Sequence, residues 1–225
     1  GKIFYSGTCL SIEAAMANAA KSVAKNLVDR VMDETIDSTC IPDWIWDLDL
    51  VDGGSVNVDG YNLSLDGFYR LFELARTRVR SNILTVASGF DVAMHVKGGW
   101  KPPQNAVCHF SNQPLPFLFS NYLAGRANCV LSDQATFREE LGERAVTAID
   151  GGQLVIARRN RFLENIENSS EGRLFLYQTL SELTELLSVV SDLQPKSGGL
   201  SERIPQRFSV YDYVRTMIQG SKQAS

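Results

Sequence analysis

Strand-like and helical patterns follow one another irregularly along this chain, and that order limits the folds it can adopt. Two pairs of apolar runs flank turn residues, namely Ser55–Val58 with Asn62–Leu65 around Asp59 and Gly60, and Ala145–Ile149 with Gln153–Ala157 around Asp150–Gly152. Turn residues of this kind between two strands predict β-hairpins. Hairpins mixed with helices, without a regular strand–helix alternation, favour an α+β fold with a mixed or antiparallel sheet.

Long amphipathic helices are expected around these hairpins. Apolar residues recur at helical spacing over three segments, Ser11–Glu34, Gly67–Arg80 and Glu171–Leu193,. Ser11 is a suitable N-cap for the first helix, because its hydroxyl can accept a hydrogen bond from a free backbone N–H group. Short apolar runs predict further strands at Lys2–Tyr5, Asn82–Ala87, Val92–Val96, Ala106–Phe110 and Cys129–Leu131. We expect the helices to cover the sheet.

The chain is predicted to form one domain over residues 1–193, followed by an arm over residues 194–225. The arm begins with several glycines and prolines, which do not continue a helix,. A short terminal helix is expected from Ser209 to about Gln219, with Ser209 as its cap,. Such an arm could dock on a neighbouring copy of the chain.

Composition narrows the class of protein. The 225 residues are 44% hydrophobic and 21% charged, as in soluble globular proteins,. No apolar stretch approaches the ~20 residues that a membrane span needs, so no membrane partner is predicted. The four cysteines are scattered and lack metal-binding spacing, so we expect reduced thiols and no bound metal,. Reduced thiols predict a cytoplasmic location. No cofactor is predicted either.

The loop from Ser6 to Cys9 precedes the first helix and is one candidate site. Free N–H groups at a helix start can hold an anion and would stabilise a Cys9 thiolate. The spacing matches neither the phosphate-loop nor the dinucleotide pattern,. The favoured interpretation is therefore an ordinary loop with a buried cysteine.

Two acidic residues form a second candidate, of the metal-dependent kind. If Asp47 and Asp49 lie in a strand, both carboxylates point to one face, as a site for a divalent cation requires,. The companion residues of known nucleases and nucleotidyltransferases are absent from the surrounding sequence. A solvated acidic loop is the favoured interpretation.

The two histidines of the chain are a third candidate. If the strands Val92–Val96 and Ala106–Phe110 are antiparallel neighbours, His95 and His109 lie close together. Imidazoles titrate near neutral pH and can serve as general acid and base. Structural histidines are the favoured interpretation, since no partner motif accompanies them.

Charge is distributed unevenly along the chain. The net charge is −4, yet residues 1–66 hold four basic and eleven acidic residues, and the remainder is positive by three. Two arginine groups occur in the second part: Arg76, Arg78 and Arg80, and Arg158, Arg159 and Arg161. Arginine binds carboxylates and phosphates in bidentate fashion, so these six residues are the predicted binding residues.

These observations favour a non-catalytic assembly protein that forms a homo-oligomer through its acidic and arginine-rich faces. In a variant of this hypothesis the arginines contact nucleic-acid phosphates. The first alternative is a phosphate-ester hydrolase or nuclease that uses Asp47 and Asp49 with a divalent metal, or His95 and His109 without one. The second alternative is a small-molecule sensory domain, based on the hairpin at 145–157 followed by a long helix.

Overall fold

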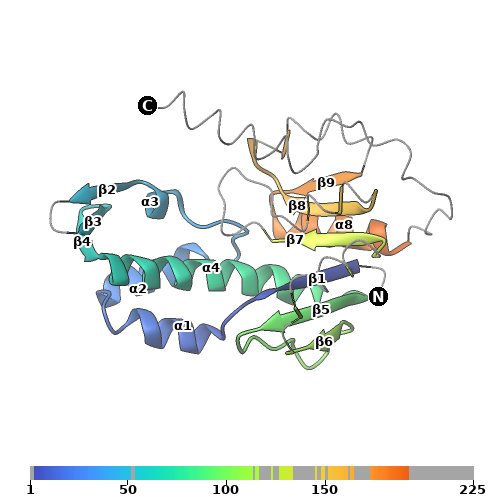
Figure 1. The fold of residues 1–225 in the computed structure, drawn as a ribbon, viewed down its shortest axis with the longest axis horizontal. Helices are drawn as coiled ribbons and strands as arrows, with labels where there is room; N and C mark the ends of the chain where they lie inside the picture. Colours follow the sequence, from blue (N-terminus) through green and yellow to red (C-terminus); the bar gives the residue numbers. More distant parts are fainter. Residues whose placement is uncertain are drawn as a thin grey trace.

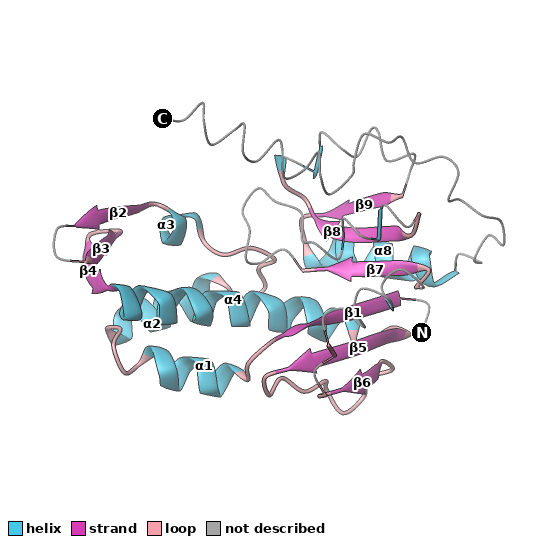
Figure 2. Ribbon diagram, in the orientation of Figure 1, coloured by secondary structure: helices cyan, strands magenta, loops and turns pink. Residues whose placement is uncertain are grey.

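A computed structural model describes residues 3–51, 54–113, 115–116, 123, 127–133, 145, 148–149, 152–161, 163–164 and 173–192 (Figure 1). Its strands form two sheets, one of six strands and one of three, together with helices (Figure 2). The predicted α+β class is thus confirmed. The predicted arm, residues 194–225, lies outside the described residues. No helix in the described part of the chain is long and apolar enough to cross a membrane.

The larger sheet is parallel throughout. In spatial order its strands are β6 (His109–Ser111), β5 (Val92–Lys97), β1 (Ile3–Thr8), β7 (Cys129–Ser132), β8 (Leu154–Arg158) and β9 (Leu174–Tyr177). Numbered along the chain within this sheet, the order is 3-2-1-4-5-6, that of a doubly wound sheet,. The chain builds outward from β1 on one side and then returns to build on the other, so the order reverses between β1 and β7.

Both faces of the larger sheet are buried, as parallel sheets require. Successive residues of β1 alternate between two apolar clusters: Ile3 and Tyr5 belong to one, Phe4 to the other. The first cluster includes residues of α4 (Leu65–Ala87) and α8 (Leu180–Asp192), which contact each other. The face that carries Tyr5 is therefore the face that these two helices cover.

A helical insertion separates β1 from α4. It contains α1 (Ile12–Ala19), α2 (Lys25–Glu34), α3 (Asp43–Trp46) and the smaller antiparallel sheet of β2 (Leu48–Val51), β3 (Ser55–Val58) and β4 (Tyr61–Ser64). The smaller sheet lies at the opposite end of α4 from the larger one (Figure 1). The helix α4 thus leads from the insertion back onto the larger sheet.

The predicted hairpin of β3 and β4 is confirmed. Val58 pairs with Tyr61 across a two-residue turn, and both turn residues have positive φ, 49° at Asp59 and 83° at Gly60. An Asp-Gly pair with this geometry matches the right-handed twist of the flanking strands. The predicted cap is also confirmed, because the Ser11 hydroxyl accepts a hydrogen bond from the Ala14 N–H group at 3.2 Å.

The predicted strand Asn82–Ala87 is wrong, because α4 continues through these residues. Val79, Ile83, Leu84 and Ala87 are all completely buried at spacings of three and four, which suits a helix that lies on the sheet,. A short apolar run has the same appearance in a buried helix and in a buried strand. The predicted helix Ser11–Glu34 is also interrupted, since Ala24 is extended between α1 and α2.

The predicted hairpin at 145–157 is wrong as well. Ala148 and Ile149 are helical, and only the second run forms a strand, β8, which pairs in parallel with β7 and β9. Gly152 has φ 79° and donates its N–H group to Ile149 O, and Gln153 N donates to Ala148 O. These two hydrogen bonds form a Schellman motif, so the glycine ends a helix. The predicted helix Glu171–Leu193 likewise contains β9 before α8.

Candidate functional site

The carboxyl ends of β1 and β7 meet at the point where the strand order reverses. The chain leaves β1 toward α1 on one side, whereas β7 belongs to the other half of the sheet. In open parallel sheets ligands bind in the crevice at such a switch point. We call the carboxyl ends of β1, β7, β8 and β9 the carboxyl edge.

A buried ion pair joins three elements at this edge. Arg80 of α4 forms an ion pair with Asp133, the residue after β7, and their side chains are only 12% and 9% exposed. The Tyr5 hydroxyl of β1 donates to the same carboxylate at 3.0 Å. Arg80 Nη1 also donates to the carbonyl oxygen of Thr8 at 2.8 Å. The guanidinium therefore ties α4 to the ends of both β1 and β7.

The Tyr5 hydroxyl and the Cys9 thiol beside this ion pair stay protonated at neutral pH. Burial raises the pKa of Tyr5 well above its usual value, and the charge of Asp133 raises it further. Burial also raises the pKa of Cys9 to about 12, although the nearby Arg80 charge opposes the shift. Cys9 is 2% exposed, so the predicted buried thiol is confirmed. The predicted loop from Ser6 is wrong, because β1 continues to Thr8.

The loop after β5 packs directly on the loop after β1. Cys9 N donates to Lys97 O at 2.8 Å, and Trp100 N donates to Cys9 O at 3.1 Å. Between these bonds Gly98 has φ 117°, and a Cβ atom there would lie 2.8 Å from Cys9 O. The backbone of the loop after β5 therefore covers the side of Cys9 that faces β5. The polar side chains of the carboxyl edge lie on the opposite side, toward β7.

Two more polar side chains continue the carboxyl edge on β8 and β9. Arg158 and Tyr177 are direct register partners. Tyr177 is completely buried. Burial raises the pKa of Tyr177, as does the charge of Asp133, whereas the charge of Arg158 lowers it. Asp133 and Arg158 are therefore close enough to Tyr177 for their charges to act on it.

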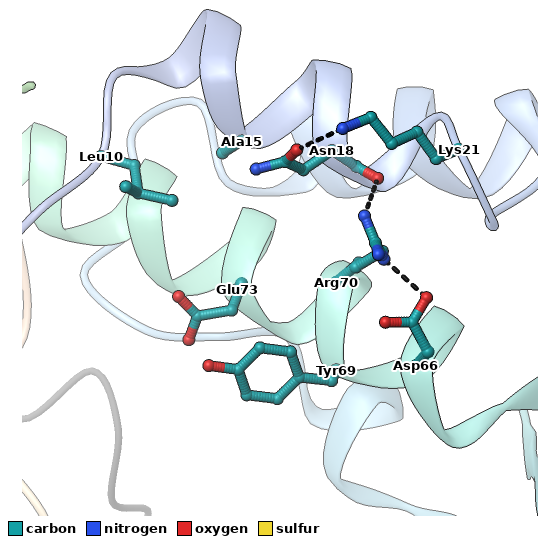
Figure 3. Close-up of a pocket in the computed structure, with 8 residues that line it drawn as sticks. All are labelled: Leu10, Ala15, Asn18, Lys21, Asp66, Tyr69, Arg70 and Glu73. Carbon is teal, nitrogen blue, oxygen red and sulfur yellow. Dashed lines mark hydrogen bonds and ion pairs between the residues drawn. The ribbon is translucent and has the colours of Figure 1, made fainter. Parts of the chain in front are cut away.

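A groove of about 420 Å³ lies between α1 and α4 (Figure 3). Its wall includes the apolar side chain of Leu10 and the largely exposed ring of Tyr69. Arg70 spans it, with Nε 2.7 Å from the carboxylate of Asp66 and Nη1 donating to Asn18 O at 3.2 Å. The groove thus combines an aromatic surface with charged groups.

The groove adjoins the carboxyl edge. Leu10 of the groove follows Cys9 directly, and Glu73 of the groove forms an ion pair of 2.6 Å with Arg76. The positive charge of Arg76, like that of Arg80, acts to lower the pKa of Cys9, so Arg76 is near the carboxyl edge. Glu73, Arg76 and Arg80 follow one another at spacings of three and four along α4, so they share one side of the helix.

The six predicted arginines have different environments. Arg80 and Arg158 lie at the carboxyl edge, and Arg76 lies beside it. Arg78 is partly buried on α4. Arg159 forms an ion pair of 3.6 Å with Glu164, and Arg161 is exposed. The two groups of the sequence thus contribute one residue each to the edge.

Asp47 and Asp49 belong to the insertion, away from the carboxyl edge. Asp47 follows α3, and Asp49 lies in β2 opposite Asn57. Among the residues that the structure describes, no cluster of His, Cys, Asp or Glu could hold a metal ion. The site proposed from these two residues remains a prediction from the sequence.

The strands of the two histidines are parallel, so the antiparallel pairing expected for them is wrong. The loop between β5 and β6 runs back to Ser88, the residue after α4 and just before β5, where Val107 N and Cys108 N both donate to Ser88 O. The chain therefore enters β6 in the same direction as β5. His109 is then in register with Ala93 and lies 3.1 Å from the carboxylate of Asp91. His95 packs against Phe4, and burial lowers its pKa.

Sequence reasoning missed three residues of the carboxyl edge: Tyr5, Asp133 and Tyr177. None belongs to a local motif, since Tyr5 lies within β1, Asp133 follows β7 and Tyr177 ends β9. Their only common signal is a polar group at the end of a buried apolar run, and it gains meaning once the strand order is known. Comparison of this chain with family models, with curated proteins and with solved structures finds no match.

Proposed function

We propose that this protein binds a small molecule at the carboxyl edge and in the adjoining groove. The observation that carries the proposal is the Arg80–Asp133–Tyr5 cluster at the switch point,. Buried charged groups are costly and concentrate at functional sites. This proposal agrees with the second alternative from the sequence, a small-molecule sensory domain, although the hairpin at 145–157 that suggested it is wrong.

The lining suggests the chemical character of the ligand. A volume of about 420 Å³ is within the range of small-molecule pockets,. The Tyr69 ring offers a stacking surface for a flat ring, and Arg158 at the edge favours an anionic group,. We therefore infer a ligand that carries both, of which nucleoside monophosphates are accessible examples.

Self-association through an arginine face and nucleic-acid binding have less support. Arg70, Arg76 and Arg80 each form an ion pair with a carboxylate of the same chain, which compensates the charge that a partner would use. Arg159 is paired in the same way. Oligomer formation, nucleic-acid contact and a cytoplasmic location thus stay predictions from the sequence.

A thermal-unfolding panel tests the proposal. Nucleoside monophosphates should raise the Tm of the wild-type protein more than the corresponding nucleosides, because a bound ligand stabilises the folded state. Arg158→Gln should weaken this stabilisation, whereas Arg159→Gln should preserve it, since Arg159 is paired with Glu164. Equal weakening by both variants, or no Tm shift with any compound, would contradict the proposal.

A further inference from the structure

We propose that Tyr177 Oη and Arg158 Nε together bind an oxyanion of the ligand, a phosphate or a carboxylate group. This inference rests on the proposed function and specifies which atoms of the carboxyl edge the anionic group contacts. The two side chains come from neighbouring strands, where Arg158 and Tyr177 are register partners at the ends of β8 and β9.

Both atoms are buried and lack a hydrogen-bond partner among the described residues. Tyr177 as a whole is completely buried, so water does not satisfy its hydroxyl at the surface. A buried donor without an acceptor costs free energy, and such groups are rare in native proteins. Two of them on register partners of neighbouring strands point to a single acceptor that serves both.

The chemistry of the two groups identifies the acceptor. An arginine Nε can only donate, and a tyrosine hydroxyl next to a guanidinium is oriented to donate as well. An oxyanion supplies oxygens that accept both hydrogen bonds, and hydrogen bonds to ionised groups are the strong ones. Arg158 is only partly buried, which gives an approach to the pair from its side.

The local charge also suits an anion. Arg80 and Arg158 contribute two positive charges here, whereas Asp133 contributes one negative charge that Arg80 and the Tyr5 hydroxyl already hold. The balance of the described residues at this part of the edge is therefore positive. A neutral acceptor would leave that charge without compensation.

Tyr5 and Tyr177 form a matched pair for the experiment. Both are buried tyrosines on the same face of the larger sheet. Among the described residues the Tyr5 hydroxyl has a partner, Asp133 at 3.0 Å, whereas the Tyr177 hydroxyl has none. Replacement by Phe removes the hydroxyl alone. In the absence of added anion, Tyr5→Phe should lower the Tm, whereas Tyr177→Phe should leave it unchanged or raise it.

The affinity for an oxyanion is then measured from the Tm as inorganic phosphate replaces chloride at constant ionic strength, with acetate as a second arm. The wild-type protein and Arg159→Gln should show the same apparent affinity. Tyr177→Phe should lose about tenfold, the effect of one charge-assisted hydrogen bond. A larger rise in Tm with phosphate than with acetate indicates a phosphate group on the ligand, and the reverse indicates a carboxylate.

Two results would overturn the inference. One is an unchanged anion affinity in Tyr177→Phe. The other is a Tm loss in Tyr177→Phe equal to that of Tyr5→Phe without anion, which means that a buried water satisfies the hydroxyl. If nucleosides stabilise the protein and neither anion does, the inference fails and the proposed function stands. If no compound stabilises it, both fail.

Discussion

Replacement of Asp133 by Ala is expected to lower the free energy of unfolding by about 3 to 5 kcal/mol, the usual cost of removing one partner of a buried ion pair. Arg80 would keep its charge in a side chain that is only 12% exposed, and the Tyr5 hydroxyl would lose its acceptor. The cost should appear in urea unfolding as a lower midpoint with an unchanged slope.

The double variant Arg80→Met/Asp133→Leu is the matched control for this prediction. Replacing both charges with apolar side chains of similar size removes the buried guanidinium together with its carboxylate, so most of the lost stability should return. A cost below about 1 kcal/mol for Asp133→Ala alone would show that the ion pair is solvated in the protein.

The second large effect is expected at Gly98. Its φ of 117° is strained for any residue with a side chain, and a Cβ atom would lie 2.8 Å from the backbone oxygen of Cys9. Strain and overlap together should cost about 3 to 5 kcal/mol in Gly98→Ala. The same change should also separate the loops after β1 and β5, which the Cys9 hydrogen bonds hold together.

Gly54→Ala separates the two causes. Gly54 also has a positive φ, 79°, but no described residue other than its chain neighbours has an atom within 4 Å of the position of a Cβ. Its cost should therefore be that of backbone strain alone, about 1 to 2 kcal/mol. If the two alanine variants unfold at the same urea concentration, the contact between the loops contributes nothing.

Local chemistry explains which parts of the fold the sequence predicts. Asp59 and Gly60 adopt the positive φ values of a two-residue turn, and Ser11 caps α1, because each depends on a few neighbouring residues,. Short-range pattern is insufficient where a buried strand and a buried helix look alike, as at 82–87. The short-range pattern is also ambiguous at Gly152, because a glycine with positive φ occurs at the end of a helix as well as in a hairpin turn,.

The site is less predictable than the fold, because it depends on strand order. The grouping of arginines in the sequence predicts that Arg80 and Arg158 bind a partner. In the fold each has a neighbour from outside its group: Arg80 pairs with Asp133, and Arg158 is the register partner of Tyr177. Asp133 and Tyr177 have no signal of their own in the sequence. They come together only because β7 and β9 lie parallel on either side of β8.

The position of a bound oxyanion tests the central claim most directly. In a nitrogen-15 NMR titration of the whole chain with inorganic phosphate, we expect the largest amide shifts at Thr8, Cys9, Asp133 and Arg158, which lie along the carboxyl edge. Amides at the opposite edge of the sheet, such as Ile3 and Val92, should change little. Shifts confined to the smaller sheet or to the exposed Arg161 would contradict a site at the switch point.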